Sequence, residues 1–216
     1  MTLDYDLMID SLPLYINAAG YTLYLAFCGI TLSILIGLIC AFILYYKTPY
    51  IGWFIRSYIE LSRNTPLLIQ LFFLHFGLKL EAETCAFVGL AFLGGSYMAE
   101  AFRGGLEAVE KAQLESASAL GLNRFQTALY VIVPQALIVS VPSIGANMIF
   151  LVKETSVVSI IAIGDILAAA KDVISIHYAT AEALIMLVAA YLALLLPISI
   201  AVHFAEKKVK FGVFGR

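Results

Sequence analysis

Five apolar stretches follow one another along the chain of 216 residues, separated by short polar segments. Asp, Glu, Lys and Arg are absent from Ser11 to Tyr46, Asn64 to Leu78, Thr84 to Ala99, Phe125 to Val152 and Ala183 to Ala205. A helix needs roughly 20 apolar residues to cross a bilayer, so the second and third runs must extend through charged ends. The pattern predicts an all-α integral membrane protein, a single domain over residues 1–216 with about five transmembrane helices.

The composition excludes a water-soluble globule, because 62% of the residues are hydrophobic and only 13% are charged. Segments 47–63, 103–124 and 206–216 hold ten of the thirteen Lys and Arg residues. Since basic loops tend to stay in the cytoplasm, we expect the amino terminus outside and the carboxyl terminus inside. The first residues lack the pattern of a cleaved signal peptide, so we expect the first helix to be retained.

A few polar side chains interrupt or flank the apolar runs. Gln70 and His75 lie within the second run, where an interhelical hydrogen bond is the simpler role and a transport role the alternative. Carboxylates precede arginines by three residues, so helix-end ion pairs are expected at Glu60 with Arg63 and at Glu100 with Arg103. Asn64 or Thr65 is a candidate helix cap. Cys28, Cys40 and Cys85 fall in apolar runs and are interpreted as buried hydrophobes, not as metal or disulfide ligands.

Segment 104–124 is polar and rich in small residues, although apolar runs flank it on both sides. Gly104 and Gly105 are expected to break the preceding helix, and a short helix should begin around Leu106 and end at Gly121, a left-handed cap. Asn123 and Gln126 have the spacing of a capping box that opens the next helix. A short helix, a tight turn and a second helix would form a compact docking element on the cytoplasmic side.

The fourth run contains Pro134 and Pro142, which are expected to break its helix and free backbone carbonyls. It is followed by the sequence LVKETS, residues 151–156. Within it, Lys153 and Glu154 form a charged pair between two apolar runs, which is the best candidate for a transport path in this sequence. The polar residues that follow are better explained by a solvated outer loop than by a partner surface; they are Asp165, Lys171, Asp172, His177 and Glu182.

Five sequence blocks resemble the permease subunit of the polar amino acid importers of the ATP-binding cassette (ABC) superfamily, the histidine and glutamine permease type. They are SRNTPLLIQLFF (62–73), SYMAEAFRGGL (96–106), QLESASALG (113–121), VIVPQAL (131–137) and LVKETS (151–156). The family's loop motif matches at Glu115, Ala117, Gly121 and Pro134. Ser116 replaces the usual alanine and Val133 the usual leucine, and the similarity extends from about Tyr21 to Glu206.

The resemblance implies a subunit of the bacterial inner membrane that works in a complex. A second permease chain, identical or homologous, would complete the pathway. Two cytoplasmic ATPases would bind ATP and magnesium, which this chain should not bind, because it has no GxxxxGK[ST] loop. An external binding protein would deliver the amino acid. Membrane lipid is implied as a further partner; nucleic acid and a bound metal are not expected.

Residue roles follow from the same resemblance. The helix around Glu115, Ser116, Ala117 and Gly121, together with Pro134, would couple to the ATPase. The substrate pathway is expected at Glu154, Asn147, Thr155, Ser156 and Gln70. An energy-independent channel or facilitator remains the alternative function. An intramembrane enzyme fits less well, because His75, His177 and His203 are far apart in the sequence and form no metal or catalytic motif. The sequence leaves the identity of the amino acid open.

Overall fold

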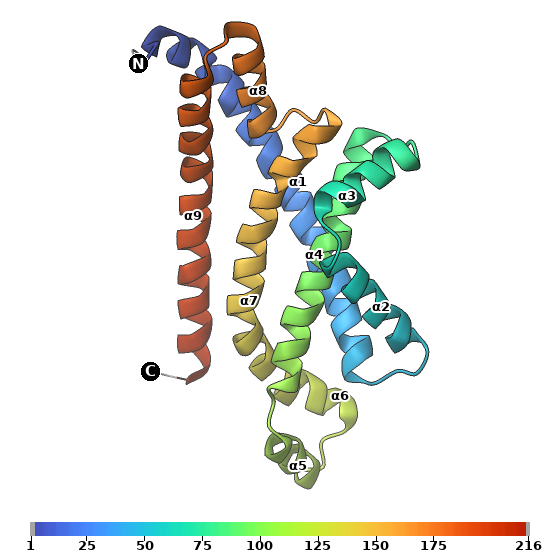
Figure 1. Cartoon of the computed structure of the whole chain (residues 1–216). Coiled ribbons are helices and arrows are strands. Elements are labelled where there is room, and N and C mark those ends of the chain that lie inside the picture. Colours follow the sequence, from blue (N-terminus) through green and yellow to red (C-terminus); the bar gives the residue numbers. More distant parts are fainter. Residues whose placement is uncertain (1–2, 215–216) are drawn as a thin grey trace. The chain divides into compact units, whose positions relative to one another are not determined.

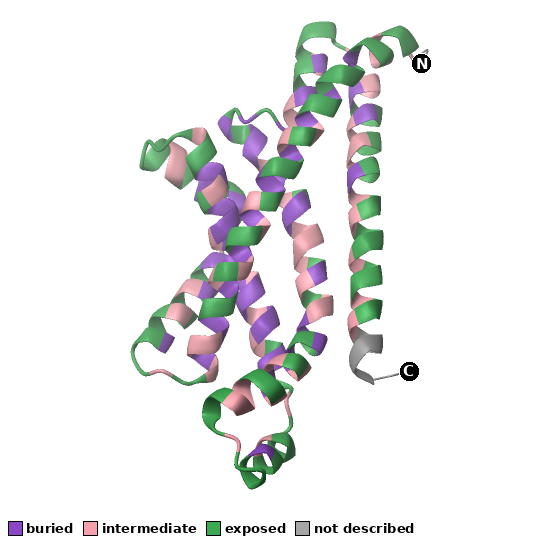
Figure 2. Ribbon diagram, turned by 180° about the vertical axis from the view of Figure 1, so that it is seen from behind, coloured by how far each residue is buried: buried purple, intermediate pink, exposed green. Residues whose placement is uncertain are grey.

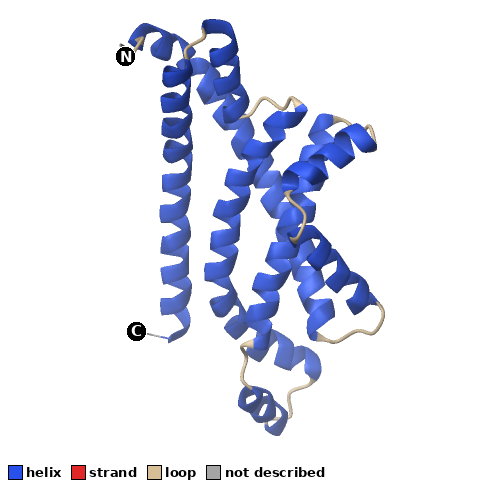
Figure 3. Ribbon diagram, in the orientation of Figure 1, coloured by secondary structure: helices blue, strands red, loops and turns tan. Residues whose placement is uncertain are grey.

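The computed structural model describes residues 3–214, and within this range the protein consists of helices joined by short turns, without a strand (Figures 1 and 3). In chain order the elements are α1 Tyr5–Tyr45, α2 Ile51–Arg63, α3 Leu67–Phe72, the π-helical turn η1 Phe73–Gly77, α4 Ala82–Glu107, α5 Lys111–Ala119, α6 Arg124–Thr127, the π-helical turn η2 Ala128–Ile132, α7 Val133–Glu154, the 3₁₀ helix η3 Thr155–Ile161, α8 Ile166–His177 and α9 Thr180–Phe214. Arg216, one of the basic residues used to orient the chain, lies outside the described residues. The all-α prediction is confirmed.

Four helical stretches within the described residues are long and apolar enough to cross a membrane: Tyr5–Tyr45, Ala82–Glu107, Arg124–Ile161 and Thr180–Val209. The second predicted span corresponds to a shorter apolar helix, Leu67–Gly77. It is short because the chain breaks between α2 and α3. Asn64 and Thr65 do not cap α3; the Asn64 side chain bonds back to the Glu60 carbonyl at 2.7 Å, and Pro66 occupies the N-cap position.

The large exposed apolar surface fits a lipid environment. In the most apolar window of α9 only 6% of the residues are buried within the chain, and Figure 2 shows α9 exposed along most of its length. Soluble proteins rarely leave apolar patches of this extent in contact with water. The helix therefore requires lipid or another protein chain around it.

The described chain forms two compact units, each assembled from separate segments. The first unit comprises residues up to Thr31, Thr65–Ala91 and Ile149–Ile200. Its core is made of small and aliphatic side chains from α1, α7, α8 and α9, among them Ala26, Val152, Ile166, Ala170, Val173, Ala183 and Met186. The Tyr15 hydroxyl donates a 2.9 Å hydrogen bond to the Ala183 carbonyl, which fixes α1 against the start of α9.

The second unit comprises Leu32–Asn64, Phe92–Met148 and the segment from Ala201 onward. Cys40, Leu44, Ile59 and Ala99 form a buried cluster between α1, α2 and α4. The Phe92 carbonyl accepts hydrogen bonds from the hydroxyls of Tyr58 (2.7 Å) and Ser62 (3.0 Å), so that α2 is tied to α4. Small residues bring the backbones close, as in other membrane bundles.

Two predicted helix breaks in this unit are wrong. Helix α4 continues through Gly104 and Gly105 to Glu107. Gly105 is instead a packing residue, since a Cβ atom there would collide with the Ser140 hydroxyl and the Ala136 carbonyl. Pro134 and Pro142 do not interrupt their helix either: η2 widens the helix just before Pro134, which cannot donate a hydrogen bond, and Pro142 lies inside α7.

Candidate functional site

The first candidate site is the element formed by α5, the turn after it and α6, defined here as the coupling element (residues 111–127). Helix α5 ends in a Schellman motif: the Gly121 amide donates to the Ser118 carbonyl at 3.0 Å and the Leu122 amide to the Ala117 carbonyl at 3.1 Å. Gly121 has a φ of 75°. The helix end and the left-handed glycine predicted from the sequence are both observed.

The start of α6 is equally well defined. The Asn123 side chain accepts from the Gln126 amide, and the Gln126 side chain accepts from the Asn123 amide, both at 2.9 Å. This reciprocal pair is the predicted capping box. Helix α5 packs against α6 and η2, so the turn is held by local hydrogen bonds and by neighbouring helices. The element is therefore expected to move as a rigid unit.

Most side chains on the coupling element are exposed. Ala117 is buried, with 3% of its surface exposed, and so faces the protein, whereas Glu115, Ser116 and Gly121 are exposed. Leu120 is 80% exposed and Phe125 75%. Sequence reasoning missed these two apolar residues, although a large apolar residue in a polar turn is the signal that would have identified them.

A hollow of about 520 Å³ adjoins the coupling element. Val109, Glu110 and Gln113 line it from the start of α5 and the loop before it, and Gln135, Ile138 and Val139 line it from α7. Pro134 is exposed beside this hollow at the start of α7. The motif residues Glu115, Ala117, Gly121 and Pro134 therefore all belong to one end of the second unit.

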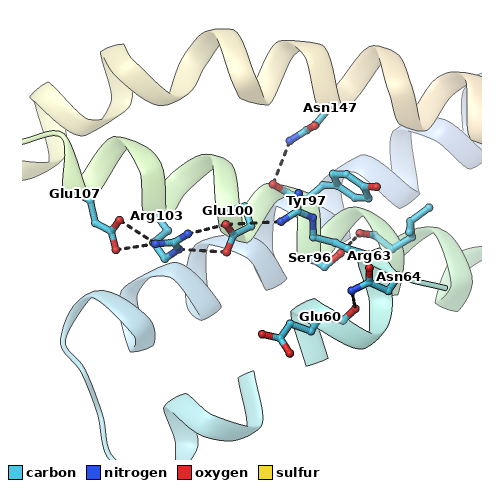
Figure 4. A network of polar contacts seen from close by, with 10 residues as sticks. Glu60, Arg63, Asn64, Ser96, Tyr97, Glu100, Arg103, Glu107 and Asn147 are labelled. Atoms are coloured by element: carbon cyan, nitrogen blue, oxygen red, sulfur yellow. Dashed lines mark hydrogen bonds and ion pairs between the residues drawn. The ribbon is translucent and has the colours of Figure 1, made fainter. Parts of the chain in front are cut away.

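An ion-pair cluster joins α2 and α4 in the same unit (Figure 4). Arg103 bonds Glu100 through Nε (3.2 Å) and Nη2 (2.7 Å), and both oxygens of Glu107 through Nη1 (2.9 Å each). Arg63 lies 3.8 Å from Glu100, and its guanidinium sits 5.2 Å from the centre of the Tyr97 ring. The ion pair expected between Glu60 and Arg63 is absent from the described residues, because Arg63 turns toward α4 instead.

The cluster ties two helices together through charged hydrogen bonds and ion pairs. Each carboxylate is shared or doubly bonded, which makes the geometry stiffer than that of an isolated surface pair. Glu107, the second partner of Arg103, was not among the predicted residues, although its spacing of four from Arg103 fits a helical pair. The network fixes the end of α2 to the part of α4 that leads into α5.

The second candidate site lies in the first unit, around the junction of α7 and η3. Glu154 is half-buried, Lys153 exposed and Thr155 fully buried. The Thr155 hydroxyl donates to the Val152 carbonyl at 2.7 Å and the Ser156 hydroxyl to the Lys153 carbonyl at 2.8 Å. Both hydroxyls bond back along the chain, so their oxygen lone pairs remain available as acceptors.

Asp165 and Tyr191 add two polar groups to this junction that the sequence did not place there. Asp165 is completely buried and caps α8, accepting from the amides of Ala168 (2.9 Å) and Leu167 (3.3 Å). The buried Tyr191 hydroxyl lies near Thr155, Ser156 and Asp165, without a well-formed hydrogen bond within the described residues. The interpretation of Asp165 as part of a solvated loop is therefore wrong.

Burial dominates the electrostatics of Asp165. Loss of solvent raises the pKa of its carboxyl to about 6, although the two amides and the nearby Lys171 lower it. The Lys171 ammonium donates to the Ser159 carbonyl at 3.3 Å and is not directly bonded to Asp165. At neutral pH the junction thus holds a buried carboxylate in addition to Glu154.

The two remaining pathway residues lie in different units. The Gln70 amide, buried in α3, donates to the Thr65 carbonyl at 2.9 Å, which closes the break before α3 in the first unit. The Asn147 amide donates to the Tyr97 carbonyl at 3.1 Å, which links α7 to α4 in the second unit (Figure 4). The Asn147 bond thus joins two helices, whereas the Gln70 bond is local to its own segment. An interhelical hydrogen bond and a transport role both stay predictions for Gln70.

Comparison with known proteins agrees with this architecture. Residues 33–211 match the family described as the binding-protein-dependent transport system inner membrane component. The chain is 34% identical over 178 residues to the probable amino-acid permease protein YxeN of Bacillus subtilis, with 79% of this chain and 80% of that protein covered. It is 28% identical over 221 residues to the glutamine transport system permease protein GlnP of Escherichia coli, with coverages of 97% and 99%.

Solved structures show the same fold. A chain in the crystal structure of an amino acid ABC transporter with histidines superposes with a TM-score of 0.88 at 33% identity, covering 96% of this chain and 100% of that chain. A chain of the inward-facing MetNI methionine ABC transporter superposes with a TM-score of 0.77 at 19% identity, with coverages of 92% and 97%, which shows a shared fold.

The all-helical membrane fold, with a short polar helix set between long spans, is that of a transporter's transmembrane component. The chain belongs to the family of binding-protein-dependent inner membrane permeases, as the transmembrane permease subunit of an amino acid ABC importer and not as its ATPase. It is a multi-pass inner membrane protein whose complex includes ATPase and binding-protein partners. The channel alternative is therefore not retained.

Proposed function

We propose that the coupling element docks into a cytoplasmic ATPase dimer and transmits its closing motion to the spans. The observation that carries this proposal is the exposed surface of Leu120, Phe125 and Glu115 on an element held by a Schellman motif and a capping box. The exposed apolar side chains can fill a groove on the ATPase. The hydrogen-bonded turn keeps the coupling element rigid, so that motion of the ATPase moves the spans and does not bend the turn. The motion would drive alternating access by rigid-body rocking.

The test of this proposal is the pair Gly121→Val and Gly121→Asn. No atom lies within 4 Å of a Cβ placed at Gly121, so its positive φ is the sole obstacle to a side chain. A β-branched residue is strained there by about 1–2 kcal/mol, whereas Asn tolerates this conformation. We expect Gly121→Val to reduce co-purification of the tagged ATPase roughly tenfold, which corresponds to about 1.4 kcal/mol, and Gly121→Asn to retain it.

Thermal unfolding of both variants in detergent serves as the control, because the spans should melt as in the unmodified protein. Normal ATPase recovery with Gly121→Val would remove the coupling element from its proposed role.

We further propose that this chain and a second permease chain form the pathway for a polar amino acid, with the substrate near Glu154, Thr155 and Ser156. The ammonium group of an amino acid needs an acceptor in a place that water reaches poorly, and the half-buried Glu154 carboxylate meets that need. The relatives named as glutamine permeases support a polar substrate. Asn147 and Gln70 are proposed as residues that hold helices bordering the pathway.

Glu154→Gln tests this assignment and Lys153→Gln is its matched control, because the two neighbours differ in burial and charge. In liposomes with the ATPase and binding protein, Glu154→Gln should lose most substrate uptake and substrate-stimulated ATP hydrolysis. Lys153→Gln should retain both. Unchanged uptake with Glu154→Gln would exclude Glu154 as a substrate ligand.

We also propose that the amino terminus lies outside and the carboxyl terminus in the cytoplasm, from the distribution of basic residues. The coupling element then faces the ATPase, and α8 faces the binding protein. A membrane-impermeant thiol reagent applied to intact cells should label Asp172→Cys on α8 but not Ser118→Cys on α5. The opposite labelling pattern would reverse the orientation.

A further inference from the structure

The turn between α1 and α2 encloses a hollow that neither candidate site uses. Its volume is about 300 Å³, and its lining includes Leu44, Lys47, Tyr50, Trp53 and Arg56, all within the second unit. The turn has a fixed shape: Lys47 and Tyr50 both adopt positive φ values, of 50° and 62°, and the Thr48 amide donates to the Ile43 carbonyl at 3.3 Å. The backbone thus holds the two ends of the hollow in place.

The hollow is positively charged and contains no acidic side chain. Lys47 and Arg56 are exposed, and neither side chain forms an ion pair or hydrogen bond within the described residues. Arg63 and Arg103, by contrast, both have carboxylate partners. Arg56 also lines the adjoining hollow at the ion-pair cluster, where Glu60 is the nearest acid along α2, but it forms no ion pair there within the described residues. Two cations that share one hollow without a bonded carboxylate favour an anionic ligand.

The position of the hollow identifies the kind of anion. Helix α1 is a candidate membrane span that ends at Tyr45, so the turn after it lies at the membrane surface. Tyr50 is 84% and Trp53 66% exposed, and aromatic side chains of this kind concentrate at the level of the lipid headgroups. Helix α2 buries Gly52, Ile59 and Ser62 and leaves the apolar side chains of Trp53, Phe54 and Leu61 exposed along its length.

We infer that this hollow binds the headgroup of an anionic phospholipid. Lys47 and Arg56 contact the phosphate, Tyr50 and Trp53 lie against the glycerol region, and Phe54 and Leu61 contact the acyl chains. Basic pockets at membrane surfaces bind such headgroups, with roughly a fivefold preference for each basic side chain. The inference depends on α1 crossing the membrane and on neither the ATPase docking nor the substrate assignment.

The single tryptophan of the chain makes a direct test possible, because all tryptophan fluorescence comes from Trp53 in the proposed site. The complete protein is placed in vesicles containing phosphatidylglycerol or phosphatidylcholine brominated on acyl carbons close to the headgroup. At equal mole fraction the brominated phosphatidylglycerol should quench Trp53 more strongly, reaching half-maximal quenching at a roughly 25-fold lower mole fraction, about fivefold for each of Lys47 and Arg56. Equal quenching by the two lipids overturns the inference.

Matched variants separate a specific site from general surface charge. The double variant Lys47→Gln and Arg56→Gln should lose the preference while ordinary quenching by phosphatidylcholine persists. The exchange Lys47→Arg with Arg56→Lys keeps both charges and should retain the preference. Lys79→Gln with Lys111→Gln removes the same net charge elsewhere and should also retain it. Loss of the preference in this last pair as well would assign it to overall charge and contradict the site.

Competition with a soluble anion tests whether the bound phosphate belongs to a lipid or to a free anion. Excess inorganic phosphate at constant ionic strength should leave the preference unchanged, because the acyl chains keep the lipid at the site. Abolition of the preference by phosphate would identify a soluble anion as the occupant and overturn the lipid assignment. Should the double glutamine variant fail to fold, the single variants Lys47→Gln and Arg56→Gln serve instead, each with an expected partial loss of preference.

Discussion

Gly121 and Gly105 are both essential to the shape of the second unit, but for opposite reasons. Gly121 is needed for its own backbone, which has a φ of 75° with open space around its Cβ position. Gly105 has ordinary helical geometry inside α4 and is needed because α7 approaches it closely at Ala136 and Ser140. One glycine satisfies a local requirement, and the other a requirement set by a distant segment.

The sequence predicted the first role correctly and the second incorrectly. Gly121 follows a run of helix-forming residues and precedes a capping box, and all of these signals lie within a few residues. Gly104 and Gly105 gave the same local signal of a helix break, yet α4 continues through both. The tertiary contact with α7 decides their role, and no residue near Gly105 in the sequence announces that contact.

The largest effect is expected at the crossing of α4 and α7. Gly105→Leu places a side chain where Ala136 and Ser140 already lie, so the helices must separate. Overpacking costs typically 1–3 kcal/mol and more where backbone must move, and we expect loss of about 3 kcal/mol or of folding altogether. Thermal unfolding and yield of monodisperse protein in detergent would measure it.

Gly104→Leu is the matched control for this substitution, because no atom lies within 4 Å of its Cβ position and the residue is exposed. It should be neutral or stabilising by up to about 1 kcal/mol through its better helix propensity. If both leucine variants behaved alike, the glycines would act through helix propensity and the packing role of Gly105 would be wrong.

The same division between local and distant determinants describes the rest of the fold. The four long spans, the end of α5 and the capping box were predictable, since apolar runs and caps act within one helix. The short α3 was not predictable, because the chain breaks between Arg63 and Leu67. The continuity of α7 was not either, since a π-helical turn precedes Pro134 and Pro142 lies inside the helix. The fold brings Tyr191 close to Asp165 and Thr155. The spacing of these residues in the sequence does not reveal this proximity.

Asp165 combines both kinds of determinant and gives a pH-dependent test. The Asp165 side chain caps α8 through amides two and three residues further along the chain. Its burial depends on tertiary packing and raises the pKa of the carboxyl from 3.8 to about 6. The folded state therefore binds more protons between pH 4 and pH 6, and this contribution to the free energy of unfolding falls as pH rises through that window. Between pH 7 and pH 5 the gain is about 1 kcal/mol, or roughly 2–4 °C in melting temperature.

Asp165→Asn keeps a cap residue and removes the titrating group, so this part of the pH dependence should disappear from its melting curves. The other carboxylates remain in the variant, and the difference between the two proteins isolates Asp165. Parallel pH profiles for the two proteins would show that the Asp165 carboxyl is solvated after all.

The smallest effect is expected where the determinants are purely local. Asn123→Ala removes one half of the capping box and should cost about 1 kcal/mol, because the Gln126 amide loses its 2.9 Å hydrogen bond. The cost should appear as faster hydrogen exchange at residues 124–127, with little change in the melting temperature of the spans. Gln126→Ala removes only the reciprocal bond to the Asn123 amide, so it should accelerate exchange less. Equal protection in Asn123→Ala and the unmodified protein would mean that packing against α5 and η2 alone holds α6, and the turn would then depend on tertiary contacts in the same way as Gly105.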